Sequence, residues 1–485
     1  MKLNKNTSLI ALTFCLSIGS NIVYADARSQ LTLENNCSEP VTFTVNGDNA
    51  GLNQTVTLKP NDYTNIGSYI NSNQLSHTTS NINIEYTSNN HSGAVDFLLN
   101  NGWKSNNADF KNYKGSIEVE HNSFNKSFHY DWHSYSASVK EKIPSFTVSA
   151  CAQKLNIENS DLNQYKRVLI FGDSLSDQGL LYKTTGGLVP KSTPYFRGMF
   201  SNGNPWSIQL TNRLKLNGIP VSNYAVGGAT VVFEPKWAST GLPYNLAGEL
   251  KAYKADSSAK NTKEKLAVFF IGANDYLTSK SDLTNDQINS AADIVTNKII
   301  SSIEQVNAPE TIIIGLPDLA LTPESHQRGN ERVLSAISSR HNANLQAYAA
   351  SHSNNVKFIA LDSMFNMLLT NTQAFNNKYH TTLNPNIVSN SCWSGGYFSS
   401  KGGSNKDQLY RTLLKNEQSE QDNNINNIPL TPGITTSILA GESGAMCNNP
   451  QQMAFWDHVH PTYEVHKALY QYILEELNIT SSTIS

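Results

Sequence analysis

The sequence predicts two folded parts, a small all-β domain over residues 26–155 and an α/β domain over residues 165–480. In the first part, short segments alternate apolar and polar residues with a period of two, and clusters of turn-forming residues separate them. In the second part, near-continuous apolar runs alternate with segments of helical period. The length of 485 residues also exceeds what one hydrophobic core normally serves.

The period-two segments of the first part predict a β-sandwich or a β-barrel. No helical period of useful length interrupts them. The expected strands cover residues 30–35, 41–47, 54–60, 82–88, 115–121 and 145–150.

The second part predicts a three-layer, doubly wound α/β domain with a five-stranded, mostly parallel sheet. Buried strands that alternate with helices are typical of a parallel sheet covered on both faces. The apolar runs lie at 167–174, 221–228, 266–275, 311–318 and 356–363, and helical periods lie at 204–214, 287–306, 330–351 and 464–477. Ligands of such sheets bind outside the carboxyl ends of the strands.

The first 25 residues predict a secretory signal peptide cleaved after Ala25. Lys2 and Lys5 precede a short apolar stretch, and small residues stand at the cleavage positions. A lipoprotein anchor on Cys15 is the weaker alternative, because bulky Phe14 precedes that cysteine inside the apolar stretch. We therefore expect a secreted, extracellular protein.

The formal net charge of the chain argues against some classes of partner. Loss of the two leader lysines changes the formal net charge from −3 to −5. That balance argues against nucleic acid and against a polybasic grip on acidic lipid. The glycine pairs lack the context of a nucleotide-binding loop, so we expect no cofactor and no metal.

Four cysteines remain after the leader, namely Cys37, Cys151, Cys392 and Cys447. An even number in an exported chain favours two disulfides, although three pairings are open. We favour Cys37–Cys151 and Cys392–Cys447, because each pair brackets a segment of distinct character. A zinc site is the rival interpretation, but no CxxC or HxxxH spacing supports it.

Residues 371–448 interrupt the α/β pattern, since they are polar and rich in Gly, Asn and Gln. We expect a long insertion at the surface, tethered if Cys392 and Cys447 pair. Such a loop is usually functional or disordered. It is expected either to cover the site until a protease cleaves it or to be a passive loop.

Two segments supply the groups that acyl transfer requires of a nucleophile and a base. Ser174, in "FGDSLSDQG", lies in a strand-to-helix turn that exposes its hydroxyl. His460, in "FWDHVHPT", is the candidate base, and Asp457 three residues earlier can accept a hydrogen bond from its other ring nitrogen. His458 is ranked well behind His460, because it is two residues away and should point elsewhere.

Two further segments supply donors for a developing oxyanion. Gly228, in "NYAVGGAT", permits close approach of the backbone, and Asn274, in "IGAND", offers a side-chain amide. The Ser174 N–H is the third expected donor. Each residue alone also has a structural explanation as a helix cap or a turn residue, but Ser174, Gly228 and Asn274 all follow strands of one expected sheet.

In order, these four segments resemble the four blocks of the GDSL (SGNH) hydrolases over about residues 165–470. "FSNGNPW" (200–206) and "LPDLALTP" (316–323) are similar to the bacterial branch of glycerophospholipid:cholesterol acyltransferases and thermolabile haemolysin phospholipases. The resemblance implies Ser174 as nucleophile, with Asp457 and His460 completing the triad. It implies an oxyanion hole of Ser174, Gly228 and Asn274.

The resemblance also implies a substrate. We expect a phospholipase A or lysophospholipase that contacts membranes peripherally, acts on glycerophospholipid or lysophospholipid, and has cholesterol as a candidate acyl acceptor. A GDSL esterase for glycan acetyl groups or small soluble esters is the alternative. A binding or adhesion protein on an inactive hydrolase scaffold is a third hypothesis, against which the complete set of site residues argues.

Overall fold

The computed structural model describes most of the chain. The described residues are 27–37, 39–47, 53–59, 63–71, 78–101, 106–122, 127–131, 136–140, 145–151, 153–157, 160–184, 189–192, 194–233, 245–397 and 444–483. The expected signal peptide lies outside them. The chain divides into two compact units, one ending at Lys154 and joined by the last residues from Ser481, the other spanning Leu155–Thr480.

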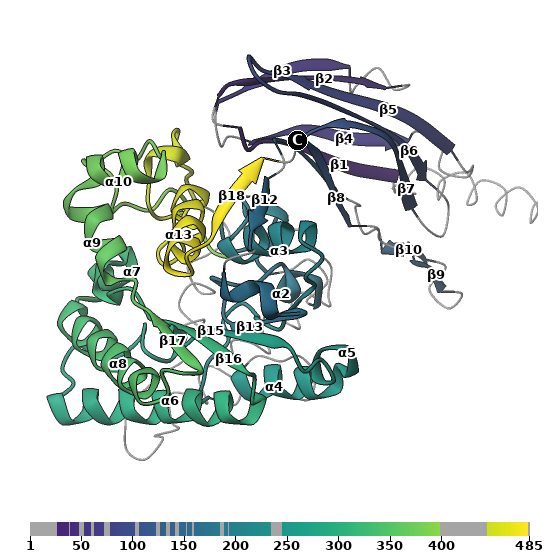
Figure 1. Ribbon diagram of the computed structural model, residues 1–485. Coiled ribbons are helices and arrows are strands. Elements are labelled where there is room, and N and C mark those ends of the chain that lie inside the picture. Colours follow the sequence, from purple (N-terminus) through teal and green to yellow (C-terminus); the bar gives the residue numbers. More distant parts are fainter. Residues whose placement is uncertain are drawn as a thin grey trace, which may run out of the picture. The chain divides into compact units, whose positions relative to one another are not determined.

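The first unit contains two larger sheets (Figure 1). One has the order β4-β1-β11-β8 and the other β3-β2-β5-β6-β7. The strands are β1 (Ala27–Asn35), β2 (Val41–Gly47), β3 (Gln54–Leu58), β4 (Tyr63–Asn71), β5 (Thr78–Thr87), β6 (Ser92–Asn101), β7 (Asn106–Gly115), β8 (Ile117–Asn122) and β11 (Ser145–Ala150). Inward residues of both sheets, such as Leu33, Phe43 and Val148, form one core, so the fold is a sandwich.

Three strands of these sheets were not predicted, namely β4, β6 and β7. In β4 and β6, glycine, asparagine and adjacent apolar residues obscure a period of two, and β7 is mainly polar. A separate hairpin of β9 (Ser127–Asp131) and β10 (Ser136–Lys140) was also not predicted. The remaining short pair consists of β12 (Gln153–Asn156) and β18 (Thr480–Thr483).

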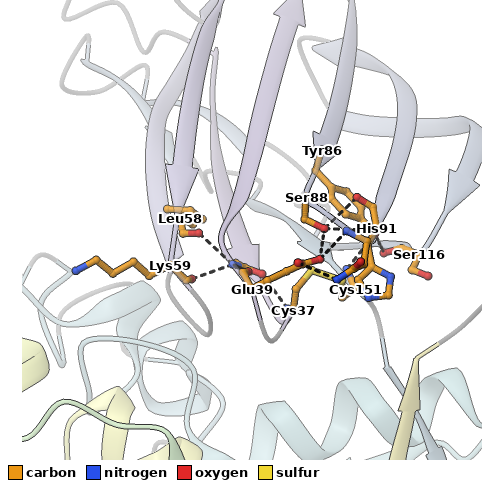
Figure 2. Close-up of a disulfide and its surroundings, with 11 residues drawn as sticks. Cys37, Glu39, Leu58, Lys59, Tyr86, Ser88, His91, Ser116 and Cys151 are labelled. Carbon is orange, nitrogen blue, oxygen red and sulfur yellow. Dashed lines mark hydrogen bonds between the residues drawn. A yellow bond between two sulfur atoms is a disulfide. The ribbon is translucent and has the colours of Figure 1, made fainter.

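A disulfide joins Cys37, just after β1, to Cys151, just after β11 (Figure 2). Polar bonds surround it. Cys151 N–H donates to the Tyr86 hydroxyl, which donates in turn to the Ser116 carbonyl at 2.9 Å. The Glu39 carboxylate accepts from the Ser88 hydroxyl at 2.6 Å. These contacts fix the end of the sandwich at which β1 and β11 finish.

The second unit is built on a five-stranded sheet, as the sequence predicts, and all four strand pairs are parallel where the prediction was mostly parallel. Its order is β14-β13-β15-β16-β17, which is the flavodoxin-like 2-1-3-4-5 arrangement. The strands are β13 (Arg167–Gly172), β14 (Val221–Asn223), β15 (Lys265–Phe270), β16 (Glu310–Ile314) and β17 (Val356–Ile359). The chain order reverses between β13 and β15, and this is the point at which ligands bind in such sheets.

Helices cover both faces of this sheet (Figure 1). On one side α6 (Asn285–Val306) packs against α8 (Glu331–Ser351), and on the other α3 (Trp206–Leu216) packs against α13 (Tyr463–Glu476). Helix α6 starts in a capping box, in which Thr284 and Gln287 bond each other's backbone N–H. The other described α-helices are α2 (Leu180–Thr184), α4 (Leu246–Ala255), α5 (Ser257–Lys260), α7 (Pro323–Arg328), α9 (Asp362–Thr370) and α10 (Thr372–Tyr379).

The range 371–448, expected to be a polar surface insertion, differs from that expectation in its described parts. It begins with helix α10, and Phe375, Tyr379 and Trp393 are buried. A disulfide joins Cys392 to Cys447, and Cys392 N–H donates to the Phe455 carbonyl at 3.0 Å. Asn and Thr surround these apolar residues in the sequence, so the local composition did not indicate a buried segment. Residues 398–443 lie outside the described residues, so a covering role that a protease removes stays a prediction.

No helix among the described residues is long and apolar enough to cross a membrane.

Candidate active site

Ser174 lies just beyond the carboxyl end of β13. The turn that carries it is closed by Ser176 N–H and Asp177 N–H, which donate to the Asp173 carbonyl at 3.0 and 2.9 Å. Leu175 N–H donates to the Asp173 carboxylate at 3.0 Å. The next helix, α2, begins only at Leu180, so the turn is longer than a simple strand-to-helix connection.

The Ser174 hydroxyl contacts His460, which lies near the C-terminal end of the sequence of this unit. His460 Nε2 lies 2.7 Å from Ser174 Oγ. His460 Nδ1 lies 2.9 and 2.7 Å from the two carboxylate oxygens of Asp457. All three residues are more than nine-tenths buried. The structure therefore brings together the nucleophile, base and carboxylate that the sequence nominates, in the order a catalytic triad requires.

A single local turn holds the carboxylate. Val459 N–H and His460 N–H donate to Asp457 Oδ1 at 2.9 and 2.8 Å. Burial opposes ionisation of this group. The nearby charge of His460 and the hydrogen bonds outweigh burial, and they hold the pKa of Asp457 below its ordinary value. His458 takes another direction, since its ring contacts the Gln327 amide at 3.2 Å.

Gly228 and Asn274 lie beside this arrangement. Gly228 has φ +77°, a conformation that glycine adopts without strain. Asn274 follows β15 in a short 3₁₀ turn (Ala273–Asp275), and its amide donates to the Ala229 carbonyl at 3.0 Å. A carboxamide has two N–H donors, so this bond leaves a second donor on a side chain that lines the cavity.

A single cavity is lined by Ser174, Gly228, Asn274 and His460. The rest of its wall is mainly apolar and comes from several elements of the second unit. Its large apolar residues are Leu175, Phe200, Phe270, Leu277, Leu319, Leu321, Phe365, Phe455, Val459 and Leu469, and Asp173, Asp318, Thr322 and Tyr397 contribute polar groups. The Ser174 hydroxyl and the His460 ring therefore lie at a cavity whose wall is mainly apolar.

Three buried carboxyl groups that the sequence did not single out accept hydrogen bonds from backbone N–H groups near Ser174 and Gly228. Asp177 accepts from Gly227 N–H at 2.7 Å, and Glu249 of α4 accepts from Gly172 N–H at 3.0 Å. Asp275 accepts from Val231 N–H at 2.8 Å. Burial raises the pKa of Asp177 to about 6 and of Asp275 to about 7, and raises that of Glu249 well above its ordinary value.

Two buried tyrosines that the sequence did not single out also contact the candidate triad. The Tyr195 hydroxyl donates to Asp457 Oδ2 at 2.7 Å, and the Tyr397 hydroxyl lies 3.2 Å from His460 Nδ1. Neither lies in one of the four recognised blocks, so no local pattern marks them. Tyr397 belongs to the range that was expected to be a surface insertion.

No group of three or more His, Cys, Asp or Glu side chains in the described parts of the chain has an arrangement that could hold a metal ion. The two disulfides observed pair all four cysteines outside the leader region, which disfavours a zinc site built on them.

Comparison with known proteins agrees with this geometry. A family model described as GDSL-like Lipase/Acylhydrolase matches residues 168–473. The phosphatidylcholine-sterol acyltransferase of Aeromonas hydrophila is 30% identical over 319 residues, which is 63% of this chain and 88% of that protein.

Two further relatives match over shorter stretches. A secreted effector protein of Salmonella typhimurium is 31% identical over 39% of this chain, and the thermolabile hemolysin of Vibrio parahaemolyticus is 26% identical over 35%. The alignments span 44% and 38% of those proteins, less than half of their lengths. The resemblance to the acyltransferase and haemolysin branch is thus confirmed.

Proposed function

We propose a specific function for this chain, which belongs to the GDSL-like lipase/acylhydrolase family. It is a secreted enzyme that hydrolyses acyl esters of glycerophospholipids. Family membership makes it an ester hydrolase or acyltransferase. The observation that carries the finer proposal is the cavity in which Ser174 and His460 face an apolar wall. An acyl chain requires such a wall, whereas an acetyl group does not.

In the proposed mechanism, His460 Nε2 takes the proton of Ser174 as Oγ attacks the sn-1 or sn-2 acyl carbonyl. Asp457 stabilises the imidazolium that results. The Ser174 and Gly228 N–H groups and the Asn274 amide donate to the oxyanion. Removal of one such donor typically costs about 3 kcal/mol of transition-state stabilisation.

Collapse of the tetrahedral intermediate breaks the bond to the lysophospholipid oxygen, which receives the proton from His460. An acyl ester then remains on Ser174. Water attacks this ester as His460 takes its proton. The bond between the acyl carbon and Ser174 Oγ then breaks, Oγ receives the proton from His460, and a free fatty acid leaves. We propose cholesterol as an alternative acceptor, because the relative from Aeromonas hydrophila is named as a sterol acyltransferase.

An esterase for glycan acetyl groups or small soluble esters is the second candidate. The same triad and oxyanion donors would serve it, so chemistry alone does not separate the two. The two candidates differ in the physical form of the substrate. The apolar wall favours a long-chain substrate that forms aggregates over a small soluble ester. Secretion is supported by the disulfides Cys37–Cys151 and Cys392–Cys447, which persist in oxidising compartments.

The test uses vesicles of phosphatidylcholine and cholesterol, with products quantified by mass spectrometry. The wild-type protein is expected to release fatty acid and lysophospholipid, and cholesteryl ester if sterol is an acceptor. Ser174→Ala should release none. Ser351→Ala, which removes an exposed hydroxyl at the end of α8, should behave as wild type. Hydrolysis of acetylated xylan or a short soluble ester, without any action on vesicles, would favour the second candidate.

A further inference from the structure

Tyr195 contacts the carboxylate of the proposed triad directly. Its hydroxyl donates to Asp457 Oδ2 at 2.7 Å, the same distance at which that oxygen meets His460 Nδ1. The other oxygen, Oδ1, accepts the two backbone N–H groups of the local turn. The carboxylate is therefore held on both oxygens, and Tyr195 is the partner that comes from a distant segment, 262 residues earlier.

The surroundings of Tyr195 fix its ring. It is fully buried, and its ring makes edge contacts with those of Phe200, Tyr397 and Trp456 at centroid distances of 6.1, 5.6 and 6.3 Å. Its backbone N–H donates to the Lys191 carbonyl at 3.2 Å. Burial, followed by the charge of Asp457, raises the pKa of Tyr195 well above its ordinary value, so the hydroxyl stays a donor at any working pH.

We infer that Tyr195 is a positioning residue of the proposed triad, which orients the Asp457 carboxylate toward His460 and withdraws part of its negative charge. This inference rests on the proposed function of Ser174 and His460. A charge-assisted hydrogen bond of this kind is among the strong ones. Without it, Asp457 would keep more charge for the imidazolium of His460 but would lose one of the contacts that set its orientation.

Two opposite consequences follow for Tyr195→Phe. Poorer orientation should lower kcat about tenfold while KM stays nearly constant, because the hydroxyl touches no substrate. A more strongly charged Asp457 should favour the protonated state of His460. On the acid limb of the pH profile of kcat/KM, His460 no longer acts as a base. This limb should therefore shift to higher pH in the variant.

Other titratable groups lie near Asp457 and His460. They must be the same residues in the variant and in the wild-type protein. Asp173 and His466 interact with His460 electrostatically, and Tyr397 contacts its ring. Burial raises the pKa of Asp173 to about 6, within the range of the acid limb. The relevant quantity is thus the difference between Tyr195→Phe and wild type, since Asp173, His466 and Tyr397 are unchanged in both.

The experiment measures pH profiles of kcat and kcat/KM with a soluble p-nitrophenyl ester. The matched control is Tyr224→Phe, which removes a tyrosine hydroxyl that donates to Asp256 at 2.9 Å and contacts no triad residue. Only Tyr195→Phe should lower kcat and shift the acid limb. A wild-type profile for Tyr195→Phe, with Ser174→Ala inactive, would overturn the inference and leave the proposed function standing.

A second measurement does not depend on activity. The Nδ1–H proton of His460 should give a low-field proton resonance, assigned by its absence in His460→Gln. In Tyr195→Phe this resonance should move further downfield, because Asp457 becomes the stronger acceptor. An unchanged resonance in a variant that melts at the wild-type temperature would contradict the inference, even if no ester is hydrolysed and the proposed function fails.

Discussion

His460 Nε2 lies 2.7 Å from Ser174 Oγ, although 286 residues separate the two in the chain. Ser174 follows the first strand of the parallel sheet, and His460 precedes the last helix of the unit, α13. Their meeting places a base beside a hydroxyl at the switch point of the sheet. The proposal of ester chemistry depends on this relationship.

Asn274 gives a test of the proposed oxyanion hole. Asn274→Ala should lower kcat about 100- to 1,000-fold with little change in KM, because the amide donates to charge that develops only in the transition state. Steady-state kinetics with a soluble ester measure this. Asn344→Ala is the matched control, since that amide bonds Asp293 on the outer helices. A loss confined to KM would assign Asn274 to substrate binding instead.

Glu249 tests whether the end of β13, just before Ser174, must be anchored to helix α4. The carboxyl group accepts from Gly172 N–H, and burial raises its pKa well above the ordinary value, which favours the neutral form. Glu249→Gln should keep this acceptor and retain most of the activity. Glu249→Ala should lower kcat and the melting temperature together. Equal activity of the two variants would show that the bond to Gly172 does not matter.

Asp275 predicts a dependence of stability on pH. Its pKa is about 7 in the folded protein against an ordinary 3.8, so the folded state binds the proton more tightly. This contribution to stability is present below pH 4 and is lost as the pH rises toward 7. Asp275→Asn should reduce the fall in melting temperature between pH 5 and pH 8. An equal fall in melting temperature in the variant and the wild type would contradict the raised pKa of Asp275.

The Cys37–Cys151 disulfide predicts separate behaviour of the two units. It closes a loop with a sequence separation of 114 residues, and its loss should destabilise the β unit by about 4 kcal/mol. The double variant Cys37→Ser/Cys151→Ser should lower the melting transition of that unit in calorimetry. Hydrolysis of a soluble ester at low temperature should stay unchanged, because the candidate site lies wholly within the other unit.

The α/β fold was predictable because its strands are near-continuous apolar runs that end in small or polar residues. Ser174, Gly228 and Asn274 became candidates for the same reason, since each follows such a run. Strands β4 and β6 were missed because glycine and asparagine break their alternation. A sequence pattern reports local periods, so these sheet neighbours became visible only in the structure.

The long-range partners of the site could not be predicted. Tyr195 and Asp457 are 262 residues apart, and nothing local distinguishes that tyrosine from others in the chain. Tyr397 lies in a stretch whose composition is polar, although its own side chain is buried. Recognised blocks identify the groups that react. The groups that hold them depend on how distant segments pack.

The most direct test of the proposed role of Ser174 is covalent trapping of its hydroxyl. A long-chain p-nitrophenyl phosphonate would be incubated with the wild-type protein and with Ser174→Ala, and the adducts would be located by intact-mass and peptide mass spectrometry. The proposed nucleophilic role of Ser174 predicts one adduct on that residue in the wild type and none in the variant. An active wild-type protein with no adduct at Ser174, or with the adduct on another residue, would contradict it.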